Sequence, residues 1–301
     1  MKKSIGYIAL LFLTGFTSCK EYGVSINSND NLAEDTTYVS KTPEPAELKN
    51  FLVEELNGVK CGACPEGAAF LEKLNGDNDH RFRIIAIHQG TLTDMITNRE
   101  PKSIQDLSTG KGGDGSQILN GIFGEQGSKP TACFDRWPQG TGTNVYLADG
   151  ANQWPPRIAE MKKRRDKTPV NLKVESKYNT DKDQYDITVT LHYTQAVKGE
   201  NKLFIYLTEN NIKDAFTYSD TLITYNHVFR KAVTDPVGRP FLVNVNKEPG
   251  RVYIYRAAVK VDKTDARQKF WVPENMKVVA FVSNPGPDDK SVLQVQETDF
   301  R

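Results

Sequence analysis

Residues 51–87 read FLVEELNGVKCGACPEGAAFLEKLNGDNDHRFRIIAI, and this stretch decides how the first half of the chain folds. The apolar run from Phe51 to Leu56 has the length and composition of a strand. From Glu66 to Leu74 apolar side chains recur at helical spacing, and Phe82 to Ile87 is a second apolar run of strand length. A strand, a helix and a strand within about 38 residues predict a right-handed crossover with two parallel strands.

Cys61 and Cys64 form a CxxC turn at the start of this helix, and Pro65 suits its first turn. The free N–H groups and the positive dipole end at a helix N-terminus stabilise a thiolate. Because Cys64 lies one turn further on, the pair can close a small disulfide and cycle between dithiol and disulfide. An inert structural disulfide is an open alternative. A zinc site is another, but the chain has no second CxxC or HxxxH to complete it.

Two further residues of this half carry possible chemistry. His88 follows the second strand at its carboxyl end, where parallel strands also place the CxxC turn, so a neutral imidazole there could move protons. A hydrogen-bonded structural histidine is the alternative. Cys133 is the odd thiol once Cys61 and Cys64 pair, and we expect it to be a small buried side chain.

A long glycine-rich insertion, residues 89–127, precedes Pro130. Long loops beside a site often act as lids or binding surfaces. The Gly110-Lys111-Gly112-Gly113 stretch lacks the spacing of a phosphate-binding loop, so we exclude that class of site. Ile158 to Arg165 is predicted to be the closing helix of this half, with cations that compensate the helix dipole.

The N-terminus carries a secretory address. Lys2-Lys3 precedes an apolar run from Ile5 to Leu13, which is too short to span a bilayer, and small residues lead to Cys19. This pattern resembles the lipobox of bacterial lipoproteins, in the looser form of Bacteroidetes because Phe16 stands where leucine is usual. The resemblance implies a signal peptide over residues 1–18 and lipidation of Cys19. An ordinary cleaved signal with an incidental cysteine is the alternative.

Length and charge limit the class of protein. The 301 residues favour two domains of roughly 150 residues each. Lys and Arg number 39 against 38 Asp and Glu, a net charge of +1, so no strong field selects nucleic acid or an anionic membrane. Membrane attachment would therefore depend on lipid. The polar composition of residues 19–48 predicts a flexible tether between that lipid and the first domain.

The second half is predicted to be all-β. Short apolar or alternating runs are separated by turn residues, as expected for a sandwich. The expected strands are Val170–Tyr178, Tyr185–Thr194, Lys202–Leu207, His227–Val233, Phe241–Val245, Val252–Val261, Lys277–Val282 and Val292–Gln296. Tyr225, Asn226, His227 and Arg230 form its most unusual polar cluster, which we interpret as a hydrogen-bonded network at a strand edge rather than a site.

The first half resembles the thioredoxin-like fold in more than its CxxC turn. Ser128-Lys129-Pro130-Thr131 is similar to the cis-proline loop that faces the CxxC in that fold. The resemblance implies that Lys129, with Thr131, binds an extended substrate and that Pro130 forms the docking turn. Glu55, six residues before Cys61, matches the buried acid that helps to deprotonate the second cysteine. There are two alternatives: Glu54 occupies this place if the register of the strand is shifted, or Glu55 is only a carboxylate on the surface of the strand.

The whole chain resembles the outer membrane protein twenty-eight-related lipoproteins of Bacteroidetes. The match rests on the lipoprotein signal and on the Cys61–Pro65 turn, Asn226-His227-Val228-Phe229-Arg230 and Val292-Leu293-Gln294-Val295-Gln296. Members are described as associated with the outer membrane, with suggested roles in adhesion or as receptors. The resemblance thus implies location and architecture more than an activity.

Together these patterns predict a lipid-anchored envelope protein with an α/β thioredoxin-like domain and an immunoglobulin-like β-sandwich. The expected segments are a signal peptide (1–18), a tether (19–48), the thioredoxin-like domain (49–168) and the sandwich (169–301). The leading hypothesis is thiol–disulfide exchange on envelope proteins. In it Cys61 is the exposed nucleophile, Cys64 resolves and Glu55 accepts a proton, and the disulfide itself carries the electrons, so no cofactor or metal is required. The alternative is a surface binding or adhesion protein with a structural Cys61–Cys64 disulfide. Periplasmic face or cell surface stays undecided.

Overall fold

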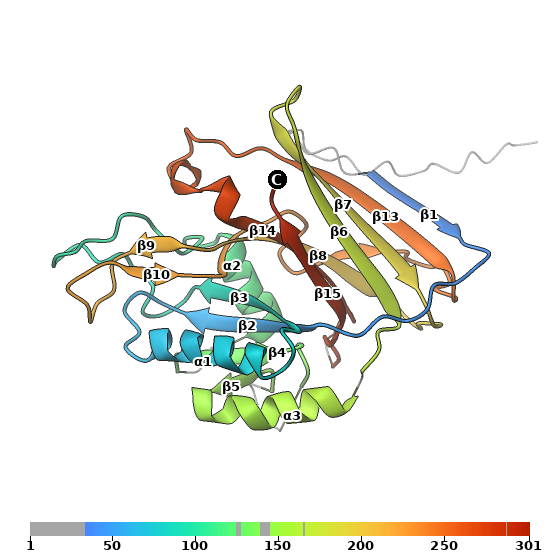
Figure 1. The fold of residues 1–301 in the computed structure, drawn as a ribbon, viewed down its shortest axis with the longest axis horizontal. Coiled ribbons are helices and arrows are strands. Elements are labelled where there is room, and N and C mark those ends of the chain that lie inside the picture. Colours follow the sequence, from blue (N-terminus) through green and yellow to red (C-terminus); the bar gives the residue numbers. More distant parts are fainter. Residues whose placement is uncertain (1–33, 125–127, 139–144, 165, 287) are drawn as a thin grey trace, which may run out of the picture.

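A computed structural model describes residues 34–301 except 125–127, 139–144, 165 and 287. The predicted signal peptide and Cys19 lie outside the described residues. The described chain is mostly β, with its longer helices in the first half (Figure 1).

The first half contains a strand–helix–strand unit followed by shorter strands and helices. Its elements are β2 (Phe51–Asn57), α1 (Cys64–Gly76), β3 (Phe82–His88), α2 (Asp114–Ile118), the π-helix η1 (Leu119–Phe123), β4 (Thr131–Phe134), β5 (Leu147–Asp149), the 3₁₀ turn η2 (Ala151–Gln153) and α3 (Trp154–Arg164). β2 and β3 pair in parallel around α1, so the predicted crossover unit is confirmed. β4 pairs antiparallel with β2, and β5 pairs antiparallel with β4. α2 and η1 lie in the predicted insertion.

The second half consists of strands and two short 3₁₀ turns. Its elements are β6 (Val170–Asn179), β7 (Gln184–Tyr193), β8 (Asn201–Glu209), β9 (Ile212–Asp214), β10 (Ile223–Tyr225), β11 (Val228–Ala232), β12 (Arg239–Phe241), β13 (Arg251–Val259), η3 (Gln268–Phe270), η4 (Pro273–Asn275), β14 (Met276–Ser283) and β15 (Val292–Asp299). The predicted strand Phe241–Val245 is wrong in its position, because β12 ends where it was expected to begin. Leu242 and Asn244 have φ of 49° and 59°, a left-handed backbone that ends a strand.

The main sheet runs through both halves of the chain. It has nine strands in the order β15-β14-β8-β11-β3-β2-β4-β5, with β12 paired to β8. The junction is a parallel contact between β3 and β11, where Val228 lies opposite Ala86 and the Ala86 N–H donates to the His227 carbonyl at 2.8 Å. The predicted division at residues 168 and 169 stays a prediction, but hydrogen bonding continues across it.

Three apolar cores show how the main sheet is covered. On one face, residues from β2 to β15 form a single cluster with α2 and η1. On the other face α1 and α3 cover the strands of the first half. Beside them a four-stranded sheet, β1-β13-β7-β6, packs on β8 and β14 (Figure 1). The second half is therefore a β-sandwich in coarse form, and its immunoglobulin-like character stays a prediction.

Part of the predicted tether is structured. Residues Glu34–Val39 form β1, which pairs antiparallel with β13 from Glu34 opposite Arg256 to Val39 opposite Arg251. The tether prediction for residues 19–48 thus differs from the structure over this segment. Backbone pairing on the free edge of β13 orders residues whose polar composition alone predicts a flexible chain.

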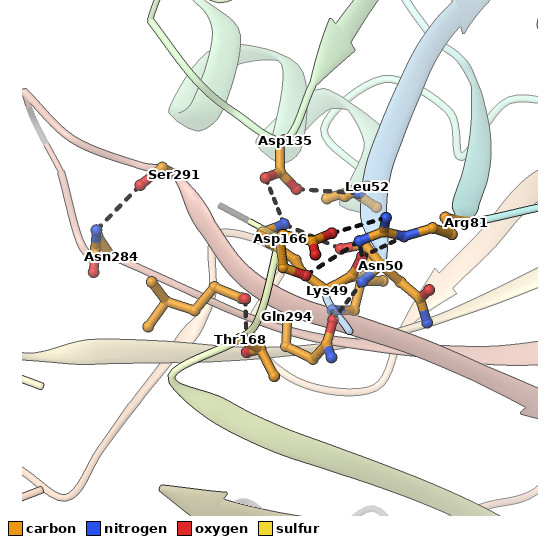
Figure 2. A network of polar contacts seen from close by, with 12 residues as sticks. Lys49, Asn50, Leu52, Arg81, Asp135, Asp166, Thr168, Asn284, Ser291 and Gln294 are labelled. Atoms are coloured by element: carbon orange, nitrogen blue, oxygen red, sulfur yellow. Dashed lines mark hydrogen bonds and ion pairs between the residues drawn. The ribbon is translucent and has the colours of Figure 1, made fainter. Parts of the chain in front are cut away.

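A polar network joins the segment before β2 to β15 (Figure 2). Lys49 lies 2.5 Å from the Asp135 carboxylate, and Arg81 donates to the Lys49 carbonyl at 2.6 Å. The Gln294 side chain of β15 accepts from the Asn50 N–H at 2.9 Å. These contacts fix the start of β2, and hence the CxxC turn that follows it, against the second half.

A buried ion pair forms a further link between the halves. Arg136 donates from Nε and Nη2 to the two carboxylate oxygens of Glu54, at 2.8 and 2.6 Å, and both side chains are fully buried. The guanidinium also lies 4.4 Å and 4.8 Å from the ring centroids of Phe204 and Phe281. Glu54 comes from β2 and the two rings come from β8 and β14, so one cation holds three strands of the sheet together.

Candidate functional site

The CxxC turn lies where β2 leads into α1. Cys61 and Cys64 form a disulfide, and Cys64 is the first residue of the helix. The Cys61 carbonyl accepts from the Cys64 N–H at 3.1 Å, which closes the turn. Gly62 and Ala63 are exposed, but Cys61 and Cys64 are only 2% and 1% exposed. The expected exposed position of Cys61 is therefore wrong in this disulfide state, because the turn and its neighbours cover the sulfur.

Pro130 faces the beginning of α1. The Lys129–Pro130 peptide bond is cis, as the resemblance implied. A Cβ on Gly67 would lie 3.0 Å from Cγ of Pro130, so the proline ring packs directly on the helix one turn after Cys64. Glycine at position 67 allows this close approach. The structure thus brings Cys64 and Pro130, which are far apart in sequence, to one place.

Lys129 and Thr131 point inward rather than toward a substrate. Lys129 Nζ donates to the carbonyls of Asn57, Gln89 and Thr91 at 2.7, 2.7 and 2.9 Å, and so ties together the loops that follow β2 and β3. Burial lowers the pKa of Lys129 to about 7, against the opposing charge of Glu55. Thr131 is fully buried in β4. Their side chains are therefore engaged within the chain, and the implied binding of an extended substrate at Lys129 and Thr131 stays a prediction.

Glu55 is fully buried on β2 and lines a cavity together with Pro65 of α1. It lies on the same face of β2 as Val53, toward α1, and its Oε2 accepts from the Asn57 side chain at 3.2 Å. Burial raises the pKa of Glu55 to about 8. The hydrogen bond from Asn57 and the charge of Lys129 each lower this pKa, whereas the charge of Glu72 raises it further. Of the two alternatives, the surface carboxylate is wrong, and Glu54 is on the opposite face with Arg136. At neutral pH Glu55 is therefore largely protonated.

His88 ends β3 opposite Asn57 and is almost completely buried. Its ring meets the edge of Tyr225 with centroids 5.5 Å apart. Burial, then the charges of Lys129 and Arg230, lowers the pKa of His88 to about 3, so the imidazole is neutral. Among the described residues neither ring nitrogen has a hydrogen-bond partner. The alternative of a hydrogen-bonded structural histidine is therefore not supported.

A cavity of about 210 Å³ connects these two buried groups. Glu55 and His88 line it, and Glu72 of α1 and His227 lie at its wall, with Nε2 of His227 2.6 Å from the Glu72 carboxylate. Tyr225 and His227 belong to the polar cluster that the sequence analysis interpreted as a strand-edge network. Both are hydrogen-bonded as interpreted, Tyr225 to the Ala215 carbonyl and His227 to Glu72, and both also line this cavity, which the sequence did not predict.

Tyr218 is the neighbour that the sequence analysis missed. A Cβ on Gly62 would lie 3.2 Å from Cε2 of Tyr218, so the ring contacts the CxxC turn. The sequence signal is a pair of aromatic residues, Phe216 and Tyr218, in the loop between β9 and β10, and no local pattern connects them to residue 62.

The geometry can support thiol–disulfide chemistry, with a disulfide at the N-terminus of α1 and a neutral acid and a neutral base in a cavity that the first turns of this helix line. Within the described ranges, no group of three or more His, Cys, Asp or Glu side chains is placed to hold a metal ion. Cys133 is fully buried and forms no disulfide, which confirms the expected small buried side chain. None of the helices in the described part of the chain is long and apolar enough to cross a membrane.

The chain is similar in sequence or in structure to several known proteins. The family model of outer membrane protein Omp28 matches residues 127–300, a range that includes Pro130 but not Cys61 or Cys64. HBP35 of Porphyromonas gingivalis has a similar structure, with a TM-score of 0.62 and 17% identity over 85% of this chain and 76% of that chain. A crystal structure of an Agrobacterium tumefaciens protein has a TM-score of 0.47 and 16% identity, over 85% of this chain and 97% of that one. No curated protein sequence matches the chain.

Proposed function

Because this chain belongs to the Omp28 family of outer membrane proteins, we propose that it is a lipid-anchored envelope protein that exchanges thiols and disulfides with other envelope proteins. The predicted lipobox at Cys19 supports the anchor. The substrates would be envelope proteins that contain cysteine. The exchange reaction is compatible with a location on the periplasmic face or on the cell surface.

One observation carries the proposal: the Cys61–Cys64 disulfide lies at the N-terminus of α1, and both a cis-proline that packs on this helix and a cavity that holds the buried acid Glu55 adjoin its first turns. This juxtaposition, together with the structural likeness to HBP35, supports a thioredoxin-like domain over residues 49–168. A disulfide that served only as a staple would not require a buried carboxyl at Glu55, because an uncharged apolar residue would fill that space without the cost of burying it.

The proposed reaction starts from the disulfide state. A thiolate of a substrate dithiol attacks Sγ of Cys61, the Cys61–Cys64 bond breaks, and Cys64 leaves and takes the proton of neutral Glu55. The second substrate thiol then loses its proton and attacks the substrate sulfur that is bonded to Cys61. This closes the substrate disulfide and releases Cys61. The substrate is oxidised to a disulfide, and this chain is reduced to a dithiol. Starting from the dithiol, the same steps in reverse reduce a substrate.

The second candidate function is a surface binding or adhesion protein with a structural disulfide. Burial of Cys61 and Cys64 favours it, because a covered sulfur reacts slowly. The two functions differ in whether Cys61 forms covalent intermediates with other proteins.

Cys64→Ala in the native envelope separates the two functions. Without Cys64 a mixed disulfide on Cys61 cannot resolve, so we expect reducible adducts to accumulate and to be identified by mass spectrometry. The double variant Cys61→Ala with Cys64→Ala should form none, and Cys64→Ala with Cys133→Ala should form as many as Cys64→Ala. Absence of adducts from Cys64→Ala would leave the binding function as the better account.

A further inference from the structure

The β9–β10 ribbon reaches from the second half of the chain to the CxxC turn. Its two strands pair with each other in a separate two-stranded sheet, which extends beside the first half in Figure 1. The loop between them is fixed at its base: Thr217 donates its N–H to the Val59 carbonyl at 3.1 Å. Arg99 donates to the carbonyls of Thr217 and Ser219, the latter at 3.1 Å. The loop is thus held in place beside the disulfide.

Tyr218 is the part of this loop that covers the turn. One side of its ring lies against Gly62, and the ring of Phe216 supports it edge-on at 5.7 Å. Tyr218 is nevertheless 70% exposed. The ring therefore shields the turn and also presents an aromatic surface to anything that approaches Cys61.

Apolar side chains are also exposed in the two loops that flank the turn. Leu92, Met95 and Leu222 are 44%, 37% and 39% exposed. Leu92 is adjacent to the turn, because its carbonyl accepts from the Lys60 N–H at 3.0 Å. The turn therefore has two exposed apolar neighbours, Leu92 and the ring of Tyr218, as surfaces that contact other molecules have.

The two lysines next to Cys61 and Pro130 both have partners. Lys129 donates to three carbonyls, and Lys60 lies 3.8 Å from the Asp94 carboxylate. A small anionic thiol such as glutathione is bound most readily by a free cation or an unoccupied donor. The surface around this disulfide is better suited to an apolar polypeptide.

We propose that Tyr218 is a specificity-determining residue of this disulfide site, which selects extended polypeptide segments with an aromatic or apolar side chain beside their cysteine. This inference rests on the exchange function proposed above. The substrate side chain stacks on the ring of Tyr218 and packs on Leu92, and the substrate thiolate then attacks Sγ of Cys61. The Cys61–Cys64 bond breaks, a mixed disulfide forms, and Cys64 takes a proton from Glu55.

The test measures how fast three thiols reduce the disulfide of the purified full chain by stopped flow. The thiols are glutathione and two synthetic peptides that differ only in having tryptophan or serine on each side of one cysteine. Wild type and Tyr218→Phe should react with the tryptophan peptide roughly five to ten times faster than with the serine peptide, because one aromatic contact stabilises the complex by about this factor. Tyr218→Ala should lose this preference and react faster with glutathione. Tyr38→Ala, a change of an exposed tyrosine on β1, should behave as wild type.

Two results would overturn the inference. Tyr218→Ala could keep the preference for the tryptophan peptide, or it could speed up all three thiols equally, which would make the ring a simple cover. The Tyr218→Phe variant guards against misfolding, because it keeps the ring. Failure of the exchange function is seen separately, as missing adducts of Cys64→Ala in the envelope, whereas peptide selectivity is measured on the isolated chain.

Discussion

Arg136→Ala is expected to lower the free energy of unfolding by about 3–5 kcal/mol, the largest loss that we predict for a single substitution. The change leaves the Glu54 carboxylate buried without its partner and removes the cation from the rings of Phe204 and Phe281. Urea unfolding at neutral pH, followed by circular dichroism, measures the loss.

Two comparisons make this prediction specific. Lys73→Ala breaks an exposed pair with Asp77, and we expect a loss below about 0.5 kcal/mol. Replacing both buried partners, Glu54→Leu with Arg136→Met, should restore much of the stability, because no buried charge is then left unpaired. If Arg136→Ala costs no more than Lys73→Ala, the buried pair does not hold the sheet together as we describe.

Glu55→Gln is expected to gain stability relative to wild type as the pH rises. The pKa of Glu55 is raised from an ordinary 4.5 to about 8 in the folded chain, so between these values only the folded state binds the proton. Wild-type stability from this group is therefore complete below pH 4.5 and is lost as the pH rises through 8. The difference in free energy of unfolding between Glu55→Gln and wild type should grow by about 4–5 kcal/mol over that window.

The comparison with wild type is needed because two neighbouring groups change the stability with pH in the opposite direction to Glu55. The pKa of His88 is lowered to about 3 and that of Lys129 to about 7, so each makes the folded chain more stable as the pH rises. Urea unfolding of both proteins at pH 4.5, 6, 7 and 8 isolates the Glu55 contribution. Glu175→Gln, at an exposed position of β6, should show a constant difference from wild type. A constant difference for Glu55→Gln as well would mean that its carboxyl is not buried in the folded chain.

Local patterns predicted the elements better than their long-range contacts. Apolar periodicity is a local property, and it correctly predicted β2, α1 and β3 and the longer strands of the second half, although it missed the short strands β9 and β10 and misplaced β12. It could not predict that β11 pairs with β3, because that contact depends on packing between segments about 140 residues apart. For the same reason Tyr218 and Tyr225 could not be assigned to the site. Arg136 was missed because charged side chains are almost always exposed unless they are paired.

The site itself was only partly predictable. The resemblance gave the cis bond at Pro130 and the buried place of Glu55, both of which depend on short motifs. The inward turn of Lys129 was not predictable, because it depends on carbonyls of residues 57, 89 and 91 that come together only in the folded chain.

The parallel contact between β3 and β11 has a consequence for how the protein is made. Until residue 228 has been synthesised and exported, β3 is an edge strand, and its apolar residues Ile85 and Ile87 have no neighbour on that side. Unpaired edges of this kind recruit strands from other chains, and closing a sheet over so long a sequence separation is slow. The unfinished chain should therefore depend on a holding chaperone during its passage through the envelope, and a fragment that ends near residue 168 should aggregate rather than fold.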